Sequence, residues 1–257
     1  MVMFYFSGTG NSEYIAKLFG RYMNAPCYSI EEKASDKKID FGLLMSANET
    51  IGFCYPIYGS RVPRIMREFV QKYMEFLKDR KLIILCTQMI FSGDGARVFT
   101  DLFPKNFMEV IYAEHFLMPN NVVNFFLLPL TNTKKIKRCV AGADQKMQIV
   151  CDNINKGIVK KRGFNIVSRL LGLVQGSFMP GIEKKALNSV HINNDCTQCL
   201  LCVSLCPMKN LELQNGKITH RLNCTMCYRC INNCPQKAIT VFFHEKVKVQ
   251  YKNLTVQ

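Results

Sequence analysis

The first 157 residues alternate between short apolar runs and stretches in which apolar residues recur at helical spacing. The apolar runs, typical of buried strands, cover residues 2–6, 51–57, 81–89 and 110–118. The stretches with helical periodicity cover residues 11–24, 62–76, 94–103 and 134–154. Strands that alternate with helices predict a parallel sheet covered by helices on both faces. We therefore expect an α/β domain over residues 1–157.

A basic connector follows, over residues 158–189. Three basic residues precede five apolar residues at helical spacing: Lys160, Lys161 and Arg162, then Phe164, Val167, Leu170, Leu171 and Val174. A helix of this pattern either docks on a neighbouring domain or lies in a membrane interface. The pattern alone leaves both interpretations open.

Residues 190–257 form a third region that repeats itself. The period is about 28 residues, from Cys196 to Cys224. The two halves are joined by Asn215 and Gly216 between apolar residues, a strong hairpin signal. Each half reads as a cysteine loop, a short helical turn and a strand, and the last strand lies near residues 238–243. We expect a small α+β domain with an internal two-fold repeat.

Composition and the pattern of apolar residues indicate the cellular compartment of the protein. The chain has 257 residues, of which 48% are apolar, enough for a globular core. No apolar run is long enough to span a bilayer, and the N-terminus lacks the pattern of a signal peptide. We therefore expect a cytoplasmic protein. Thiols stay reduced there, which argues against disulfides among the 13 cysteines. Five isolated ones are expected to be buried thiols: Cys27, Cys54, Cys86, Cys139 and Cys151.

The net charge of +15 is unevenly distributed. Residues 1–129 hold 14 Lys and Arg against 13 Asp and Glu. Residues 130–189 hold 12 against 3, and residues 190–257 hold 8 against 3. An acidic protein, an anionic membrane surface or nucleic acid could each match this excess. An acidic redox protein that docks on the connector and the C-terminal region is the partner we expect.

Eight cysteines repeat one spacing, C-x2-C-x2-C-x3-C-P. The first set is Cys196, Cys199, Cys202 and Cys206, and the second is Cys224, Cys227, Cys230 and Cys234. Spacing by two residues lets successive turns of backbone direct sulfurs at one centre. This double run is the pattern of proteins that hold two iron–sulfur clusters. Two zinc sites built from CxxC pairs are the alternative.

On these cysteines the segment resembles bacterial ferredoxins with two 4Fe–4S clusters. The resemblance implies that the fourth cysteine of each run binds the other cluster. One cluster would then take Cys196, Cys199, Cys202 and Cys234. The other would take Cys206, Cys224, Cys227 and Cys230.

A glycine-containing loop, SGTGNS at residues 7–12, directly follows the first strand and opens the first helix. Small residues, hydroxyls and backbone N–H groups at a helix N-terminus favour a phosphate. The loop lacks the Lys of a Walker A motif and does not match G-x-G-x-x-G. An ordinary strand-to-helix turn is the alternative interpretation.

This loop resembles the phosphate loop of flavodoxins, which bind FMN. The resemblance implies a doubly wound sheet of order 2-1-3-4-5, with two later loops around the flavin ring. The residues that it assigns to FMN are Ser7, Thr9, Gly10, Asn11, Ser12, Pro56, Ile57, Tyr58, Gly59, Gln88, Ser92, Gly93 and Asp94. Many flavodoxins stack Trp on the flavin, but this chain has no Trp. Tyr58 is the first candidate to stack, with Met89 or Phe91 opposite, although each could instead belong to the core.

As a whole the chain resembles the flavodoxin–ferredoxin fusion proteins of anaerobic bacteria. The resemblance implies a carrier that passes electrons between FMN and two 4Fe–4S clusters. A flavin-dependent reductase of a small molecule, fed by its own clusters, is the alternative. A basic nucleic-acid binder is a third, although no recognition motif is present. The four histidines are scattered along the chain and indicate no catalytic group: His115, His191, His220 and His244.

Overall fold

A computed structural model describes residues 1–31, 39–91, 93–124, 128, 132–242 and 244–252. Within these residues the main element is a six-stranded sheet of order β2-β1-β3-β4-β5-β6 in which each neighbouring pair is parallel. Its strands are β1 (Val2–Tyr5), β2 (Cys27–Ser29), β3 (Thr50–Pro56), β4 (Lys81–Gln88), β5 (Glu109–Leu117) and β6 (Lys160–Lys161). The predicted order 2-1-3-4-5 is confirmed, and the connector adds a sixth strand.

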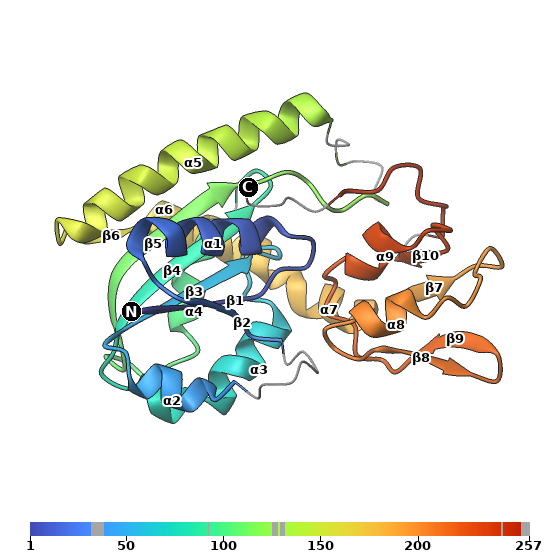
Figure 1. The fold of residues 1–257 in the computed structure, drawn as a ribbon, viewed down its shortest axis with the longest axis horizontal. Helices are drawn as coiled ribbons and strands as arrows, with labels where there is room; N and C mark the ends of the chain where they lie inside the picture. The colour runs from blue at the N-terminus through green and yellow to red at the C-terminus, as the bar shows by residue number, and fades with distance from the viewer. Residues whose placement is uncertain (32–38, 92, 125–127, 129–131, 243, 253–257) are drawn as a thin grey trace.

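Helices cover both faces of this sheet. The helices are α1 (Asn11–Met23), α2 (Phe41–Ser46), α3 (Arg64–Lys72), the short 3-10 helix η1 (Met74–Leu77), α4 (Arg97–Thr100) and α5 (Thr133–Asn155). Figure 1 shows α1 and α5 above the sheet and α2, α3 and α4 below it. Strand β4 is buried along nearly its whole length, as expected for a central parallel strand. Two separate apolar cores result, one under each helical layer.

The connector is anchored to this domain by a buried carboxylate. Glu114 on β5 is fully buried and pairs with Lys146 on α5 and with Lys160 on β6, both at 2.9 Å. Arg162 lies 3.4 Å from the same carboxylate. Burial opposes ionisation, but the bonds from Lys160 and Lys146 bring the pKa of Glu114 below its ordinary value. Two of the three basic residues at the start of the connector therefore hold the fold together instead of standing free in solvent.

Two helices complete the connector, α6 (Ile166–Ser177) and α7 (Met179–Leu187). Helix α6 begins at the cap Asn165, whose side chain accepts a hydrogen bond from the Ser168 backbone N–H. It packs closely on the α/β domain, because a Cβ atom added to Gly172 would lie 1.7 Å from a carboxylate oxygen of Asp94. This helix thus docks on the neighbouring domain through small residues such as Gly172, and not through the apolar face that the sequence indicated, because Leu170 and Val174 on that face are exposed.

The C-terminal region is built from short elements. They are β7 (Val190–Ile192), α8 (Leu201–Leu205), β8 (Leu211–Gln214), β9 (Lys217–His220), α9 (Arg229–Asn233) and β10 (Ile239–Val241). Strands β7 and β10 pair antiparallel, as do β8 and β9. Asn215 and Gly216, with φ of 49° and 71°, form the predicted hairpin turn. Figure 1 shows this region beside the ends of β1 and β3.

None of the helices in the described part of the chain is both long and apolar enough to cross a membrane. The five cysteines outside the repeat lie in the α/β domain, and Cys54, Cys86 and Cys151 among them are buried. The histidines are not all scattered: the rings of His191 and His244 meet edge to face at 4.5 Å. That contact brings two distant parts of the C-terminal region together.

Candidate functional site

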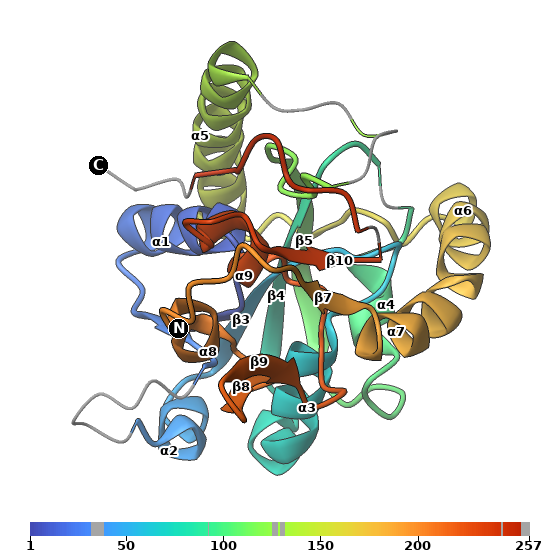
Figure 2. The same cartoon turned by 90° about the vertical axis from the view of Figure 1, so that its right-hand side faces the viewer.

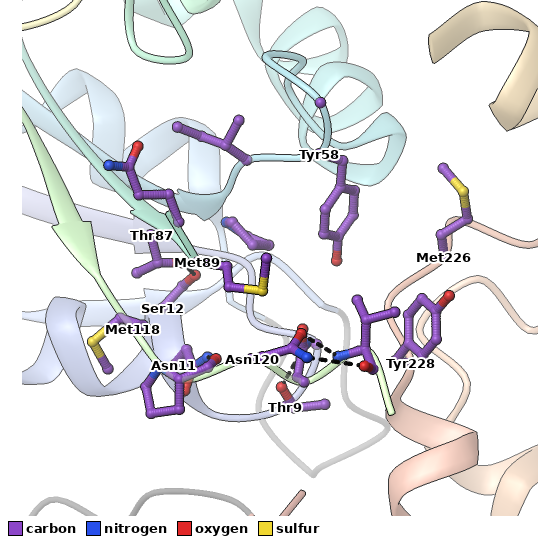
Figure 3. A pocket seen from close by; sticks show the side chains of 18 of the residues that line it. Thr9, Asn11, Ser12, Tyr58, Thr87, Met89, Met118, Asn120, Met226 and Tyr228 are labelled. Atoms are coloured by element: carbon purple, nitrogen blue, oxygen red, sulfur yellow. Dashed lines mark hydrogen bonds between the residues drawn. The ribbon is translucent and has the colours of Figure 1, made fainter. Parts of the chain in front are cut away.

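A cavity of about 500 Å³ lies at the carboxyl ends of β1, β3 and β4. Open parallel sheets bind their ligands at this edge, and the volume lies within the range of small-molecule sites. Nine predicted FMN residues line it: Ser7, Thr9, Asn11, Ser12, Pro56, Ile57, Tyr58, Gly59 and Gln88. The structure therefore brings three predicted loops together around one space (Figure 3).

The loop between β1 and α1 forms one end of the cavity. Gly10, the residue before α1, has φ of 91°, a backbone conformation that favours glycine. No side chain caps α1, so its first backbone N–H groups are available to an anion. The hydroxyl of Ser7 is buried without a hydrogen-bond partner among the described residues. An unsatisfied buried hydroxyl beside a helix N-terminus is what a phosphate group would complete.

Neighbouring polar groups of the same loop already have partners. Asn121 donates its amide to the Thr9 hydroxyl at 2.8 Å, and Ser12 shares a hydrogen bond of 2.7 Å with Thr87. Asn11 donates to the Pro119 carbonyl and accepts from the Tyr251 hydroxyl at 2.6 Å. These bonds hold the loop in shape, and they leave the Ser7 hydroxyl as the buried side-chain group most in need of a ligand.

Tyr58 stands on one side of the cavity, and its hydroxyl is also buried without a partner in the described structure. Met89 lines the cavity as well, whereas Phe91 is 47% exposed. In Figure 3 Tyr58 and Met89 flank a common space, with Met226 and Tyr228 approaching from the far side. Of the two predicted residues opposite Tyr58, the structure therefore favours Met89.

The remaining predicted FMN residues do not line this cavity. Gly10 shapes the loop, and Ser92 lies outside the described residues. Among the described lining residues, Gly93 and Asp94 are absent. Asp94 is 1% exposed and pairs with Arg97 at 2.7 Å, while Gly93 packs against the backbone of Gly172. Helix α6 occupies their side of the loop, so the structure does not bring Gly93 and Asp94 to the cavity, and their contact with a flavin stays a prediction.

Several lining residues were missed by the sequence analysis. Pro119, Asn120 and Asn121 follow β5, and their place after a parallel strand is a signal that could have found them. Other lining residues come from the connector and the C-terminal region: Met179, Ile182, Met226, Tyr228 and Phe242. No local pattern marks these as cavity residues.

The first set of cysteines assembles with its fourth member exchanged. A small cavity is lined by Cys196, Cys199, Cys202 and Cys234 together. Burial raises the pKa of Cys230, and the nearby thiols of Cys227, Cys224, Cys206 and Cys202 add to the shift. One of the two ligand sets implied by the resemblance therefore lines a single cavity, and the other stays a prediction.

The donor sets fit clusters better than single ions. In the described residues no group of His, Cys, Asp or Glu is placed to hold a metal ion directly. Four thiolates around one zinc, with bonds of about 2.3 Å, would lie within about 4 Å of one another. A cubane of four irons and four sulfides is larger, so its thiolates stand further apart. Cluster assembly must also release protons, since burial raises the pKa of Cys227 to about 12.

The loop of the second cysteine set forms part of the cavity wall. Arg229 donates to the carbonyl oxygens of Ser7, at 2.6 Å, and of Gly8, at 3.0 Å. It also pairs with Glu31, and both side chains are largely buried. A Cβ atom added to Gly8 would lie 2.3 Å from the Cys227 carbonyl oxygen, so only glycine fits there. The cavity loop and the cysteine loop are thereby in direct contact.

Comparison with known families agrees with both halves of this architecture. Residues 2–143, more than half of the chain, match the family described as Flavodoxin domain, and the chain belongs to it. Residues 195–239 match the family described as 4Fe-4S dicluster domain. A flavodoxin domain implies FMN, and a dicluster domain implies 4Fe–4S clusters. The two domains together indicate electron transfer.

Solved structures give similar matches at low identity. A WrbA-like flavodoxin from Agrobacterium tumefaciens is 14% identical, with 61% of this chain and 97% of that chain covered and a TM-score of 0.41. General stress protein 14 from Treponema denticola, in complex with FMN, is 10% identical, with 60% and 97% covered and a TM-score of 0.44. The two-electron reduced flavodoxin of Megasphaera elsdenii is 19% identical, with 56% and 99% covered and a TM-score of 0.38. No curated protein matches the chain.

Proposed function

We propose that this protein passes electrons internally between FMN and two 4Fe–4S clusters. It would thereby link one-electron and two-electron partners in anaerobic metabolism. When bound, the clusters exchange electrons singly, whereas the flavin exchanges one or two. The observation that carries the proposal is the shared wall: Met226 and Tyr228, from within the second cysteine run, line the cavity of the flavodoxin domain.

The residues of this shared wall also support an order in which electrons would pass between the two clusters and FMN. Cys227 lies against Gly8 of the cavity loop, because a Cβ atom added to Gly8 would lie 2.3 Å from the Cys227 carbonyl oxygen. Among the described residues that line the cavity, Met226 and Tyr228 come from the second cysteine run and none comes from the first run. The cluster held by Cys206, Cys224, Cys227 and Cys230 would therefore be the one nearer to FMN, and the other cluster would be the outer one.

The outer set also has the more accessible cysteine. Cys199 is exposed, whereas in the other set Cys227 is buried and the remaining three cysteines are half-buried. An external one-electron partner would reach the outer cluster there, and the basic C-terminal region would attract an acidic protein. Lys160 and Arg162 are poor candidates for this attraction, because Glu114 already binds them. An acidic redox protein would therefore dock on the C-terminal region that holds the cysteines.

The order can be tested by anaerobic rapid mixing. Four equivalents of a reduced viologen, each giving one electron, would supply one electron for each cluster and two electrons that, with two protons, fully reduce the flavin, which is followed by its absorbance. Cys206→Ser, which removes a ligand of the inner cluster, is expected to slow flavin reduction by more than about ten-fold. Cys139→Ser, on α5 outside both sets, is the matched control and leaves the rate unchanged.

Two outcomes would contradict the proposal. Flavin reduction as fast in Cys206→Ser as in the wild-type protein would mean that the flavin receives electrons without the inner cluster. Steady turnover of a small-molecule acceptor by the isolated protein would instead identify the flavin-dependent reductase. Iron of about eight atoms per chain and FMN that acid releases are the composition expected at the start.

A further inference from the structure

Helix α6 exposes its apolar face to solvent, whereas an ordinary surface helix exposes its polar face. Its apolar side chains on the outside are between 42% and 75% exposed: Ile166, Val167, Leu170, Leu171, Leu173 and Val174. Phe178, at 68%, and Ile182, at 37%, continue this surface onto α7. A surface helix normally turns its apolar stripe toward the core. Figure 2 shows α6 and α7 at one edge of the molecule, and the exposed fractions show that their apolar side chains are left uncovered there.

The inward face of α6 explains this orientation. Ser168, Gly172 and Gly176 recur every four residues and are buried. A Cβ atom at Gly176 would lie 2.9 Å from the Arg61 guanidinium, and Arg61 donates to the Gly176 carbonyl at 3.2 Å. Ser60 donates to the Gln175 side chain at 2.7 Å. Small and polar residues thus fix the helix to the domain, and every large apolar side chain is left outside.

Exposed cations lie on the same two helices as this apolar face. The connector, residues 158–189, holds six Lys and Arg against one acidic residue, Glu183. Glu183 is itself paired with Arg67 at 2.9 Å. Arg169 on α6 and Lys184 and Lys185 on α7 are exposed. The exposed surface therefore combines aliphatic and aromatic side chains with cations at its edge.

We propose that the apolar face of α6 and the start of α7 form a docking surface for anionic phospholipid membranes. Helices that lie in a membrane interface combine an apolar face with nearby Lys and Arg, which attract acidic lipid headgroups. With 12 residues, α6 is about 18 Å long, so it lies along a bilayer surface and does not cross it. Its backbone is braced by the flavodoxin domain, which presents the whole apolar face at once.

The charges favour a membrane over the other occupants. A symmetric dimer through this face would bring the cations Arg169, Lys184 and Lys185 of both copies into one interface with no acidic residue of α6 to offset them, because a two-fold interface pairs a surface with itself. An acidic protein would satisfy the cations, but the face itself is almost wholly apolar along α6. A lipid surface offers both requirements together, headgroups for the cations and acyl chains for the side chains.

Docking would also orient the redox site. Met179 and Ile182, next to the proposed surface, line the FMN cavity. The membrane would therefore lie beside the cavity, while the exposed Cys199 belongs to the small C-terminal region. The docking surface does not depend on the electron-transfer assignment, since its residues need neither cofactor to bind lipid.

Vesicle co-sedimentation of the full-length holoprotein tests the proposal. We expect binding to vesicles of phosphatidylcholine mixed with equal phosphatidylglycerol, and little binding to phosphatidylcholine alone. The variant Leu170→Gln, Leu173→Gln, Val174→Gln is expected to bind ~100-fold more weakly, since three apolar side chains would no longer enter the lipid. The control Leu43→Gln, Ile149→Gln, Leu213→Gln removes three equally exposed side chains elsewhere and keeps wild-type binding. Arg169→Gln, Lys184→Gln, Lys185→Gln reduces the preference for phosphatidylglycerol.

A fluorescent reporter gives an independent measurement, because the chain contains no Trp. Phe178→Trp is expected to shift its emission to the blue when the mixed vesicles are added, whereas Leu43→Trp, on α2, is not. Absence of binding to the mixed vesicles would overturn the proposal. Equal binding by the α6 variant and the wild-type protein would also overturn it. So would light scattering that shows a dimer for the wild-type protein and a monomer for the α6 variant.

Discussion

The two domains of this protein are stabilised in different ways. The flavodoxin domain buries large side chains on both faces of a six-stranded sheet, among them Phe4, Phe53 and Phe99 in one core and Phe19 and Tyr112 in the other. In the described residues of the C-terminal domain the sheets are two-stranded and there is one small core. Two-stranded sheets are marginally stable in water, and short segments need a covalent or metal crosslink. Apolar burial therefore suffices for the first domain, whereas the second depends on its cysteines.

The cysteines of the C-terminal domain are themselves part of its core. Cys202 is a buried member of that core, and Cys196, Cys224, Cys230 and Cys234 pack against it. A ligand set that spans both halves of the repeat joins Cys196 to Cys234 and Cys206 to Cys224. Loss of the clusters would therefore remove the links between the halves as well as the redox groups.

Removal of iron is the largest expected effect and would separate the two domains directly. Chelation under reducing conditions is expected to unfold the C-terminal domain and to leave the flavodoxin domain folded. In hydrogen exchange, amides of β7 to β10 would become unprotected, and amides of β1 to β5 would stay protected. Protection of β7 to β10 in the iron-free protein would show that this domain folds by apolar burial alone.

Arg229 provides the next largest effect, because it joins the domains. Arg229→Met would leave the Glu31 carboxylate, 11% exposed, without its cation, and would remove the donors to Ser7 and Gly8. Breaking a buried pair of this kind costs about 3–5 kcal/mol. Urea denaturation measures the loss. The matched control, Arg221→Met, breaks the exposed pair with Glu212 and is expected to cost less than about 1 kcal/mol.

The double variant Arg229→Met, Glu31→Gln sharpens the same comparison. If the pair carries the effect, the double variant loses less stability than the two single variants together, because no uncompensated charge remains. Strict additivity would mean that Arg229 acts through its bonds to the Ser7 and Gly8 carbonyls and not through Glu31.

His115 is expected to make the stability of the flavodoxin domain depend on pH. Burial lowers the pKa of His115 to about 4, and its ring nitrogen accepts a hydrogen bond from the Ala96 backbone N–H at 3.1 Å. The folded state thus favours the neutral ring, so the stabilisation is present above pH 6.5 and is lost as pH falls through 6.5 toward 4. The loss could reach about 3 kcal/mol.

His115→Gln tests this, because the amide oxygen of Gln can accept the same hydrogen bond without titrating. Hydrogen exchange of β1 to β5 amides, measured from pH 7 to pH 4, is expected to show a steeper loss of stability in the wild-type protein than in the variant. Parallel pH dependence in the two proteins would remove His115 as the cause.

Substitution of Ser7 is expected to have the smallest effect among these predictions. Its hydroxyl is the buried side-chain group at the phosphate end of the cavity that has no partner in the described structure. Ser7→Ala is expected to weaken FMN binding five- to ten-fold, about 1 kcal/mol, without changing iron content. Flavin fluorescence titration measures the affinity. Ser204→Ala, exposed on α8, is the control, and equal affinities would place the phosphate elsewhere.

Much of the fold could be predicted because its signals are local. The apolar run at residues 81–89 became the central strand β4, and the Asn215–Gly216 turn became the hairpin between β8 and β9. The cysteine spacing identified eight candidate ligands, and three loops of the cavity followed from the ends of β1, β3 and β4. Strand β6 was not expected, because two lysines have no strand pattern until Glu114 binds one of them.

The sequence by itself determined the two domain types and the candidate cysteine ligands, since strand, helix and ligand spacings are set over a few residues. Only the tertiary structure decided that Met226 and Tyr228 line the cavity of the flavodoxin domain, that Asp94 pairs with Arg97, and that the apolar face of α6 is exposed. Helical periodicity indicates that one face of the helix is apolar, but it does not indicate which face packs on the flavodoxin domain. Gly172 and Gly176 settled that, because only a helix side without large side chains could approach the backbone of the flavodoxin domain so closely.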